Sequence, residues 1–134
     1  MHWYLQAFKK YAVFSGRATR KEFWIFTLIF GIVTAVLYGV GEATKPVSGE
    51  PSHIVNILVA ILFLLWVFAH LVPAIAVTVR RLHDIGRSGW WYFIQYVPLI
   101  GPIVIIVFLV QDSQPHDNQY GPNPKMIADI TLDT

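Results

Sequence analysis

Cysteine is absent from this chain of 134 residues, which excludes disulfide bonds, thiolate metal sites and a lipidated N-terminal cysteine. Charge is scarce too: charged side chains make up 13% of the residues and hydrophobic ones 55%. A soluble domain carries about a quarter charged residues. This chain has too little polar surface to cover a globule in water, and a bilayer removes that requirement. We therefore predict a single-domain, all-α integral membrane protein.

The charges that are present gather in one polar segment between two long apolar runs, residues 79–91. Cations suit the C-terminal end of a helix and anionic lipid headgroups, and tryptophans suit the membrane interface. We expect this segment to hold two membrane helices to one side of a bilayer. Its notable members are Arg80, Arg81, His83, Asp84, Gly86, Arg87, Gly89, Trp90 and Trp91.

Residues 1–14 have an amphipathic pattern. At about 100° per residue, aromatic and aliphatic side chains share one broad face, and Lys9 and Lys10 lie on the other. Such a helix lies in the headgroup plane of a membrane, with Trp3 as an interfacial aromatic. The alternative is a helix packed on a soluble core. The two lysines follow the apolar residues, which is the reverse of a secretory signal peptide.

The first predicted membrane helix covers residues 22–41, and the stretch 23–40 contains no charge. At a rise of about 1.5 Å per residue, this run matches the thickness of a hydrocarbon core. Thr19 and Glu22 have capping-box spacing at its start, and Trp24 stands where an interfacial tryptophan belongs. A small side chain recurs every fourth residue, which predicts a packing face for another helix of this chain or of a second copy. These small residues are Gly31, Ala35 and Gly39.

The second predicted membrane helix covers residues 54–79, which is longer than a bilayer needs. Pro73 removes one backbone hydrogen bond and is expected to kink this helix. His70 is a titratable side chain within the run, and an ionisable residue inside a membrane is a functional candidate. The alternative is a neutral His70 that bonds a carbonyl or a polar side chain of a neighbouring helix.

The third apolar run, residues 90–110, is interrupted between Pro98 and Pro102. Two prolines and a glycine within five residues must disturb a helix. We favour a third, kinked membrane helix. The alternative is a re-entrant hairpin that enters the membrane and returns, which needs protein or water around its exposed backbone. Residues 111–134 follow as an irregular polar tail.

The number of lysines and arginines alternates between high and low along the chain, as expected for three membrane crossings. Five precede the first span, one lies in the loop 41–53, three lie in residues 80–89, and one lies in the tail. By the positive-inside rule, the N-terminus and residues 80–89 face the cytoplasm. Three crossings place the tail outside, whereas a re-entrant third run returns it to the cytoplasm. The expected topology anchors, which would also contact anionic headgroups, are Lys9, Lys10, Arg17, Arg20, Lys21, Arg80, Arg81 and Arg87.

Few residue patterns in this chain suggest a catalytic or metal-binding site. His83-Asp84 and His116-Asp117 would form a metal or acid–base site if both pairs lay on one face, which requires the re-entrant third run. In the simpler interpretation, Asp84 balances the arginines and His83 bonds the backbone. Because no phosphate loop, catalytic triad order or paired metal-ligand motif is present, we predict no cofactor, no metal and no catalytic residue. Basic residues beside apolar spans favour lipid phosphate over nucleic acid as a partner.

Seven motifs occur in order along the chain: residues 3–5 (WYL), 14–18 (FSGRA), 20–24 (RKEFW), 80–84 (RRLHD), 87–91 (RSGWW), 98–101 (PLIG) and 118–124 (NQYGPNP). Together they resemble the YhaH/YhaI-like bacterial inner-membrane proteins, known as domain of unknown function 805. The resemblance covers nearly the whole chain except the loop 41–53 and the end after Lys125. It implies a small, multi-pass protein of the bacterial inner membrane, and it brings no established reaction, cofactor or catalytic residue.

These features predict a membrane-embedded binding, scaffold or assembly protein that contacts anionic lipid and partner helices, in a homo-oligomer or with another membrane protein. One alternative is a small oligomeric transporter or channel component that uses His70 and the broken third run. Three short helices enclose little volume, so such a pore needs several copies. A second alternative is a membrane enzyme built on His83 and Asp84.

Overall fold

The structure is a computed structural model that describes residues 2–45 and 53–132, without the side chains of residues 2, 3, 53, 128 and 130–132. Within these residues, regular structure is helical apart from one isolated bridge between Asn118 and Gly121. This result confirms the predicted all-α class. The helices are α1 (His2–Lys9), α2 (Arg20–Ala43), α3 (His53–Asp84), the 3-10 helix η1 (Gly89–Tyr96), α4 (Ile100–Val110) and α5 (Pro124–Leu132).

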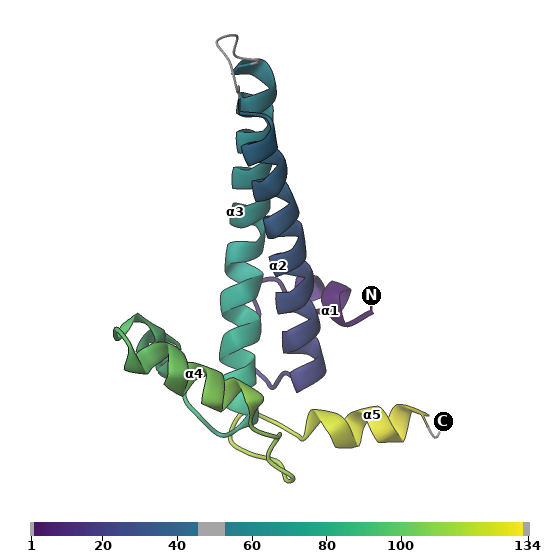
Figure 1. Cartoon of the computed structure of the whole chain (residues 1–134). Coiled ribbons are helices and arrows are strands. Elements are labelled where there is room, and N and C mark those ends of the chain that lie inside the picture. The colour runs from purple at the N-terminus through teal and green to yellow at the C-terminus, as the bar shows by residue number, and fades with distance from the viewer. Residues whose placement is uncertain (1, 46–52, 133–134) are drawn as a thin grey trace.

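The long helices α2 and α3 pack side by side as an antiparallel column (Figure 1). The shorter helices lie crosswise to it, α4 and α5 at one end and α1 against the half of the column next to that end. Both long helices are long and apolar enough to cross a membrane. Only 11% of the apolar window of α2 and 6% of that of α3 is buried inside the protein. Helices at the core of a soluble protein would be buried, so these two helices expose their side chains in the way that a lipid environment requires.

The start of α2 follows from local hydrogen bonding. Thr19 is the N-cap residue, and its hydroxyl accepts a hydrogen bond from the backbone N–H of Glu22 at 3.2 Å. That bond satisfies one of the donors left free in the first turn of a helix. The expected helix start near Thr19 is therefore confirmed.

Helix α3 is longer than the sequence predicted. It spans 32 residues, about 48 Å at 1.5 Å per residue, and runs without interruption through Pro73. The predicted end at Val79 is wrong, because Arg80, Arg81 and Asp84 belong to the last turns of the helix rather than to a loop. The kink expected at Pro73 stays a prediction.

The third apolar run does not form one membrane helix, and the favoured kinked span is wrong. Its first half is η1, its second half is α4, and the chain reverses between them so that the two arms pack against each other. Helix α4 has 11 residues and is too short to count as a membrane span. This shape corresponds to the hairpin that the sequence left as the alternative. We call residues 89–110 the broken-helix hairpin.

A close backbone approach holds the two arms of the broken-helix hairpin together. A Cβ atom at Gly101 would lie 1.9 Å from the carbonyl oxygen of Ile94. Only glycine permits this approach, because real Cβ atoms do not come that close to backbone atoms. The turn between the arms also holds Leu99 at a φ of +68°, in the left-handed region that L-residues other than Asn and Asp rarely adopt.

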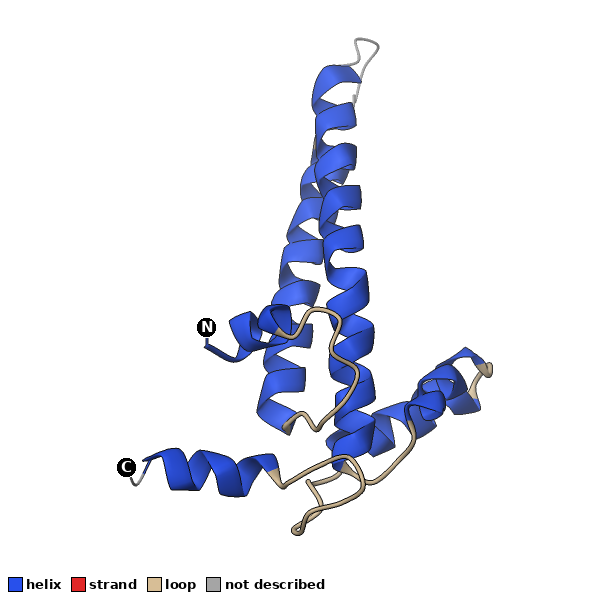
Figure 2. Cartoon of the chain, turned by 180° about the vertical axis from the view of Figure 1, so that it is seen from behind, coloured by secondary structure: helices blue, strands red, loops and turns tan. Residues whose placement is uncertain are grey.

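The tail is more ordered than the sequence predicted. It ends in α5, which begins at Pro124, a residue well suited to the first turn of a helix. The Asn123 side chain caps this turn by accepting a hydrogen bond from the Lys125 N–H at 3.0 Å. The tail passes beneath the end of α3 and the start of α2, on the same side of the column as the N-terminal segment (Figure 2). The three-crossing prediction, which placed the tail at the opposite end, does not fit this arrangement.

Helix α1 is shorter than predicted, because it ends at Lys9 and leaves residues 10–19 as a turn and an extended link. Its Tyr4, Ala7 and Phe8 side chains pack against the column. Part of the face predicted to enter the lipid interface is therefore covered by the protein itself. Leu5 stays exposed, so the expected contact of α1 with the headgroup plane stays a prediction.

Candidate functional site

Several charged side chains converge at the end of the column where the N-terminal link, the last turns of α3 and the tail meet. Five of them are buried there, with exposed fractions of 6% or less. We call these residues the arginine cluster. They are Arg17, Glu22, Arg80, Arg81 and Asp84.

Asp84, in the last turn of α3, balances two arginines at once. Its Oδ1 accepts a hydrogen bond from Arg17 Nε at 2.9 Å, and its Oδ2 accepts one from Arg81 Nη1 at 2.6 Å. The hydroxyl of Ser113 donates a third bond to Oδ2 at 2.5 Å. The expectation that Asp84 balances the arginines is confirmed, and both carboxylate oxygens are hydrogen-bonded.

Arg17 joins the N-terminal link to the tail. Its Nη1 donates to the carbonyl of His116 at 2.9 Å and its Nη2 to the carbonyl of Gln114 at 2.8 Å. A guanidinium has five donors in a fixed plane, which lets one side chain bond a carboxylate and several carbonyls together. A lysine at this position could not make the same set of contacts.

Arg81 holds the base of the broken-helix hairpin. Its Nε donates to the carbonyl of Leu109 at 3.2 Å, and its Nη2 donates to the carbonyl of Gln111. These carbonyls lie at the C-terminal end of α4, where helix carbonyls lack partners within the helix and favour a cation. Arg81 therefore connects α3 to α4 as well as to Asp84.

Arg80 and Glu22 form a second buried ion pair, with Nη1 and Oε1 separated by 3.0 Å. Neither Nη atom of Arg80 makes a well-directed hydrogen bond among the described residues, so charge attraction holds the pair. The carbonyl of Arg80 also accepts a hydrogen bond from the Ala18 N–H at 3.0 Å. Glu22 was expected only to help cap α2, and the sequence did not reveal its partner because Arg80 lies far along the chain.

His83 lies beside the arginine cluster and bonds backbone, as the simpler interpretation predicted. Its Nδ1 donates to the carbonyl of Gly16 at 3.2 Å, and its ring stacks on Tyr120 with centroids 3.8 Å apart. The carbonyl of His83 accepts a bond from Asn118 Nδ2 at 2.9 Å. His83 therefore joins the N-terminal link to the tail, and its contacts are structural.

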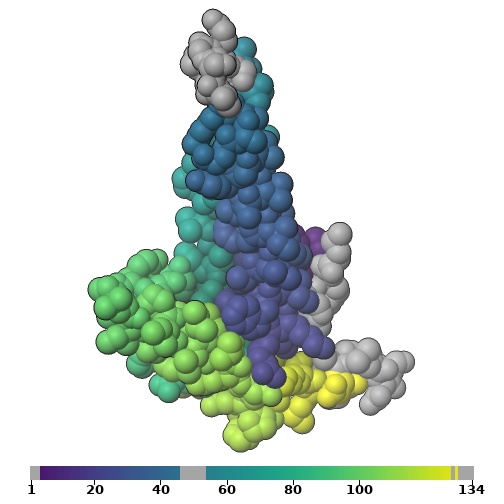
Figure 3. Space-filling model, viewed as in Figure 1, coloured from purple at the N-terminus to yellow at the C-terminus, as the bar shows by residue number. Residues whose placement is uncertain are grey.

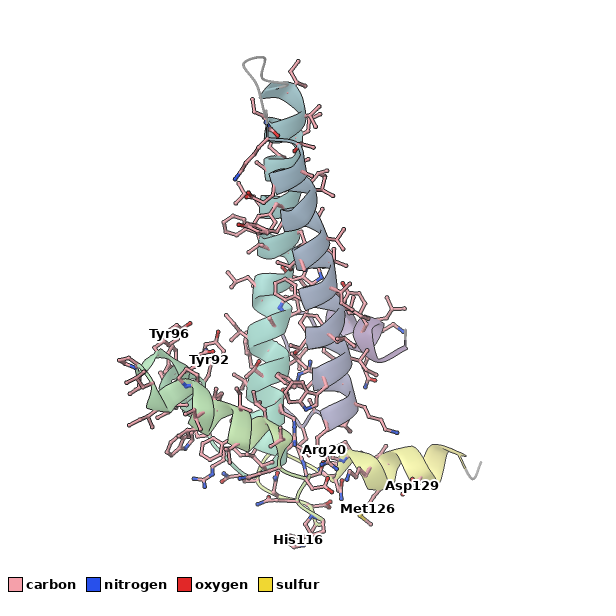
Figure 4. The ribbon with its side chains drawn as sticks, in the orientation of Figure 1. Arg20, Tyr92, Tyr96, His116, Met126 and Asp129 are labelled. Carbon is pink, nitrogen blue, oxygen red and sulfur yellow. The ribbon has the colours of Figure 1, made fainter. Side chains whose placement is uncertain are left out.

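The two His–Asp pairs do not build a common site. They lie at the same end of the molecule, as the metal hypothesis required, but Asp84 bonds arginines and Asp117 accepts a hydrogen bond from the Asn123 N–H. His116 contributes its carbonyl to Arg17, and Figure 4 shows it below the end of α3. Among the described residues, no three His, Asp or Glu side chains gather to hold a metal ion.

His70 lies between α1, α2 and α3, inside a box of aromatic rings. Its Nδ1 donates to the carbonyl of Trp66 at 2.8 Å, so its Nε2 accepts the hydroxyl proton of Tyr4 at 2.7 Å. The expected bond to a polar side chain of a neighbouring helix is made with Tyr4 of α1, whereas the carbonyl that His70 bonds belongs to its own helix. The surrounding rings belong to Tyr4, Phe8, Phe26, Phe30 and Trp66.

The predicted anchors divide into buried and exposed residues. Arg17, Arg80 and Arg81 are buried in ion pairs, so the expectation that they contact lipid headgroups directly is wrong. Their burial against carboxylates and carbonyls consumes the donors that a phosphate would need. Lys9, Lys21 and Arg87 are exposed, and Lys10 and Arg20 are partly exposed, so lipid contact stays a prediction for these five residues.

Exposed aromatic side chains surround the same end of the column. Trp24, Trp90 and Trp91 are all exposed, and Arg87 lies over the rings of Trp91 and Phe108. The side chain of Trp3 lies outside the described residues. Exposed tryptophan beside basic residues is the composition of a membrane interface.

An exposed ionic link lies outside the arginine cluster. Asp112 contacts Arg20 at 3.2 Å and accepts a hydrogen bond from Lys125. The Lys125 bond, followed by one from the Ser113 N–H, lowers the pKa of the Asp112 carboxyl below its ordinary value. Both partners are about half exposed, so solvent screening leaves this link a small contribution to stability.

The small-residue stripe does not pack within the chain. Gly31, Ala35 and Gly39 are exposed, and a Cβ added at Gly31 or Gly39 would meet no atom within 4 Å. The contact between α2 and α3 instead uses larger residues, such as Phe30 stacked on Trp66. Packing against a partner helix from outside the chain stays a prediction.

Comparison with known proteins places this fold in a family. A family model described as a protein of unknown function, DUF805, matches residues 11–122. The chain belongs to the DUF805 family. The matched residues include the whole arginine cluster, the column and the broken-helix hairpin. No solved structure shows a significant match to the chain.

Two relatives of this DUF805 protein are named inner membrane proteins. The chain is 39% identical to inner membrane protein YhaI of Escherichia coli K12 over 125 residues, which covers 93% of this chain and 97% of YhaI. It is 43% identical to inner membrane protein YhaH of the same organism over 126 residues, covering 94% and 98%. It is also 34% identical to the uncharacterized protein YiiR over 87 residues, covering 63% and 49%. These matches support the predicted bacterial inner-membrane location.

Proposed function

We propose that this DUF805 protein is a membrane scaffold without catalytic activity, anchored by the α2–α3 column and bound to anionic lipid at the cytoplasmic face. The observation that carries the proposal is the position of its exposed basic and tryptophan side chains. They lie on α1, at the start of α2, and on the broken-helix hairpin and the turn before it. The opposite end of the column exposes Lys45, but Glu42 neutralises it at 2.6 Å.

The arginine cluster supports this scaffold role by holding the end of the molecule in one arrangement. It joins three stretches that are far apart in the sequence, residues 17–22, 80–84 and 109–116, because Arg17 reaches the tail, Arg80 meets α2, and Arg81 meets α4. Breaking a buried ion pair leaves an uncompensated charge and is strongly unfavourable. The exposed basic residues outside the cluster are therefore held in a fixed arrangement by the buried ion pairs.

The catalytic and transport alternatives lack comparable support. Both carboxylate oxygens of Asp84 and both ring nitrogens of His70 are hydrogen-bonded, and His83 bonds the backbone through Nδ1. A general base needs a free atom within reach of a substrate proton. Asp84 and His70 have no unbonded side-chain oxygen or nitrogen among the described residues, and the ring of His83 is stacked on Tyr120.

A lipid-enrichment measurement tests the proposed function. Because the chain lacks cysteine, a single fluorophore can be attached through a Leu28→Cys replacement on the exposed face of α2. Energy transfer from this label to dilute anionic or zwitterionic acceptor lipids then reports which lipid surrounds the reconstituted protein. We expect enrichment of the anionic lipid and its loss in high salt.

Charge-neutral variants identify the residues responsible. Each basic side chain near an anionic surface contributes about 1 kcal/mol. Lys9→Gln with Lys21→Gln should therefore reduce the anionic enrichment clearly. Lys45→Gln, at the opposite end of the column, is the matched control and should leave it unchanged. Equal enrichment of both lipids, or an equal loss in the control, would refute the proposal.

A further inference from the structure

The broken-helix hairpin has apolar side chains on all its exposed sides. Residues 88–110 contain no charged side chain. A helix that rests on a membrane surface needs one polar face for water, and this hairpin has none. Figure 3 shows it projecting sideways from the foot of the column. Its exposed apolar residues include Trp90, Phe93, Tyr96, Leu99, Ile100 and Ile103.

We propose that the broken-helix hairpin is inserted into the hydrocarbon of one membrane leaflet, the leaflet next to the arginine cluster, with lipid acyl chains as its partner. Its tip, at Leu99, is 87% exposed, which is a large apolar area to leave in water. This inference rests on residence in a membrane and does not depend on the proposed scaffold function.

The backbone of the tip suits a medium without water. Residues 98 and 102 are prolines, which have no N–H group to leave unpaired. Val97 donates to the carbonyl of Ile94, and Gly101 donates to the carbonyl of Val97. Ile100 donates to the carbonyl of Pro98. Backbone donors at membrane depth must be satisfied by the protein itself, and prolines reduce the number that need partners.

The dimensions of the hairpin limit it to one leaflet. The 11 residues of α4 reach about 16 Å, whereas the hydrocarbon core is about 30 Å thick. The base cannot move away from the arginine cluster, because Arg81 bonds the carbonyls of Leu109 and Gln111. Figure 4 places Tyr92 and Tyr96 at the outer end of the hairpin, far from that base.

A cleft between the hairpin and the column offers the lipid acyl chains a second apolar surface to contact. Its volume is about 260 Å³, and its lining comes from α2, α3, η1 and α4. Most of that lining is aromatic or aliphatic, including Phe30, Ala74 and Ile105. An apolar cleft of this kind is unfavourable in water, whereas lipid chains fill it at no such cost.

Depth measurements on single-cysteine variants test the insertion. We would attach an environment-sensitive nitrobenzoxadiazole fluorophore at Leu99→Cys and, because a change at the tip can disturb folding, separately at Ile103→Cys. Leu65→Cys, on the exposed middle of α3, is the reference for the membrane centre. His116→Cys, on the exposed tail, is the aqueous reference. Each protein is reconstituted into phosphatidylcholine vesicles that carry nitroxide groups either near the headgroup or near the chain end.

The expected result is an intermediate depth. Labels at positions 99 and 103 should emit at shorter wavelength than the label at 116, resist iodide quenching, and be quenched more by the shallow nitroxide than by the deep one. The label at 65 should show the reverse order of the two nitroxides. The inference would be overturned if iodide quenched the labels at 99 and 103 as strongly as the label at 116. It would also be overturned if the deep nitroxide quenched both of these labels more than the shallow one, as expected for the label at 65.

Discussion

At the scale of single residues, this protein buries charge where its helices end. The arginine cluster holds three cations and two carboxylates, and each carboxylate lies within 3.0 Å of an arginine nitrogen. Taking ions out of water costs several kcal/mol per ion, and good pairing offsets that cost. Backbone carbonyls from α4 and the tail supply further acceptors to Arg17 and Arg81. These bonds fix the tail to the column.

Removing the shared carboxylate should destabilise the protein more than any surface change. In Asp84→Ala, Arg17 and Arg81 both lose their buried partner, and we expect a loss of about 3–5 kcal/mol in unfolding free energy. Asp112→Ala is the control, because its exposed ion pairs contribute about 0–1 kcal/mol. Thermal unfolding in detergent measures both. Equal unfolding temperatures for the two variants would contradict this account of the cluster.

The sequence located the charges but not their partners. The density of arginine around Asp84 was enough to predict that this carboxylate balances them, and to expect backbone contacts for His83. The buried state of Arg17 could not be predicted, because its partners lie 67 residues or more away along the chain. The positive-inside rule counts charges and cannot distinguish an arginine in water from one that is paired inside the protein.

At the scale of elements, apolar length predicted the two long helices well and the third run badly. Residues 20–43 and 53–84 contain only one proline, and α3 accommodates it. The third run has two prolines and Gly101, and local sequence alone does not decide between a kink and a reversal. The reversal follows from a tertiary contact, the close approach of Gly101 to the carbonyl of Ile94.

A glycine substitution tests the reversal. In Gly101→Ala the new methyl group would lie 1.9 Å from the Ile94 oxygen, so the arms of the broken-helix hairpin must separate. We expect faster amide hydrogen exchange in η1 and α4 and a lower unfolding temperature. Gly31→Ala, where a Cβ meets open space, should leave both unchanged or stabilise α2 by up to about 1 kcal/mol. Unchanged exchange in Gly101→Ala would show that the arms are not packed as described.

At the scale of the whole molecule, the structure has two membrane-spanning candidates, with the hairpin and the tail at one end and α1 against the adjacent half of the column (Figures 1 and 2). The N-terminal link and the tail both bond the last turns of α3, through Gly16 to His83 and through Gln114 to Asp84. Two segments that touch the same end of a membrane helix lie on the same side of the membrane. From the charge distribution we predict that both lie in the cytoplasm.

The side of the membrane on which the tail lies tests this central claim most directly. Green fluorescent protein and alkaline phosphatase are fused, in separate proteins, after Thr134, and the same pair is fused before Met1. Green fluorescent protein should be fluorescent, and alkaline phosphatase inactive, at both ends of the chain. Active phosphatase and dark green fluorescent protein at the C-terminus, with the reverse at the N-terminus, would mean three crossings and would contradict the arrangement of the arginine cluster.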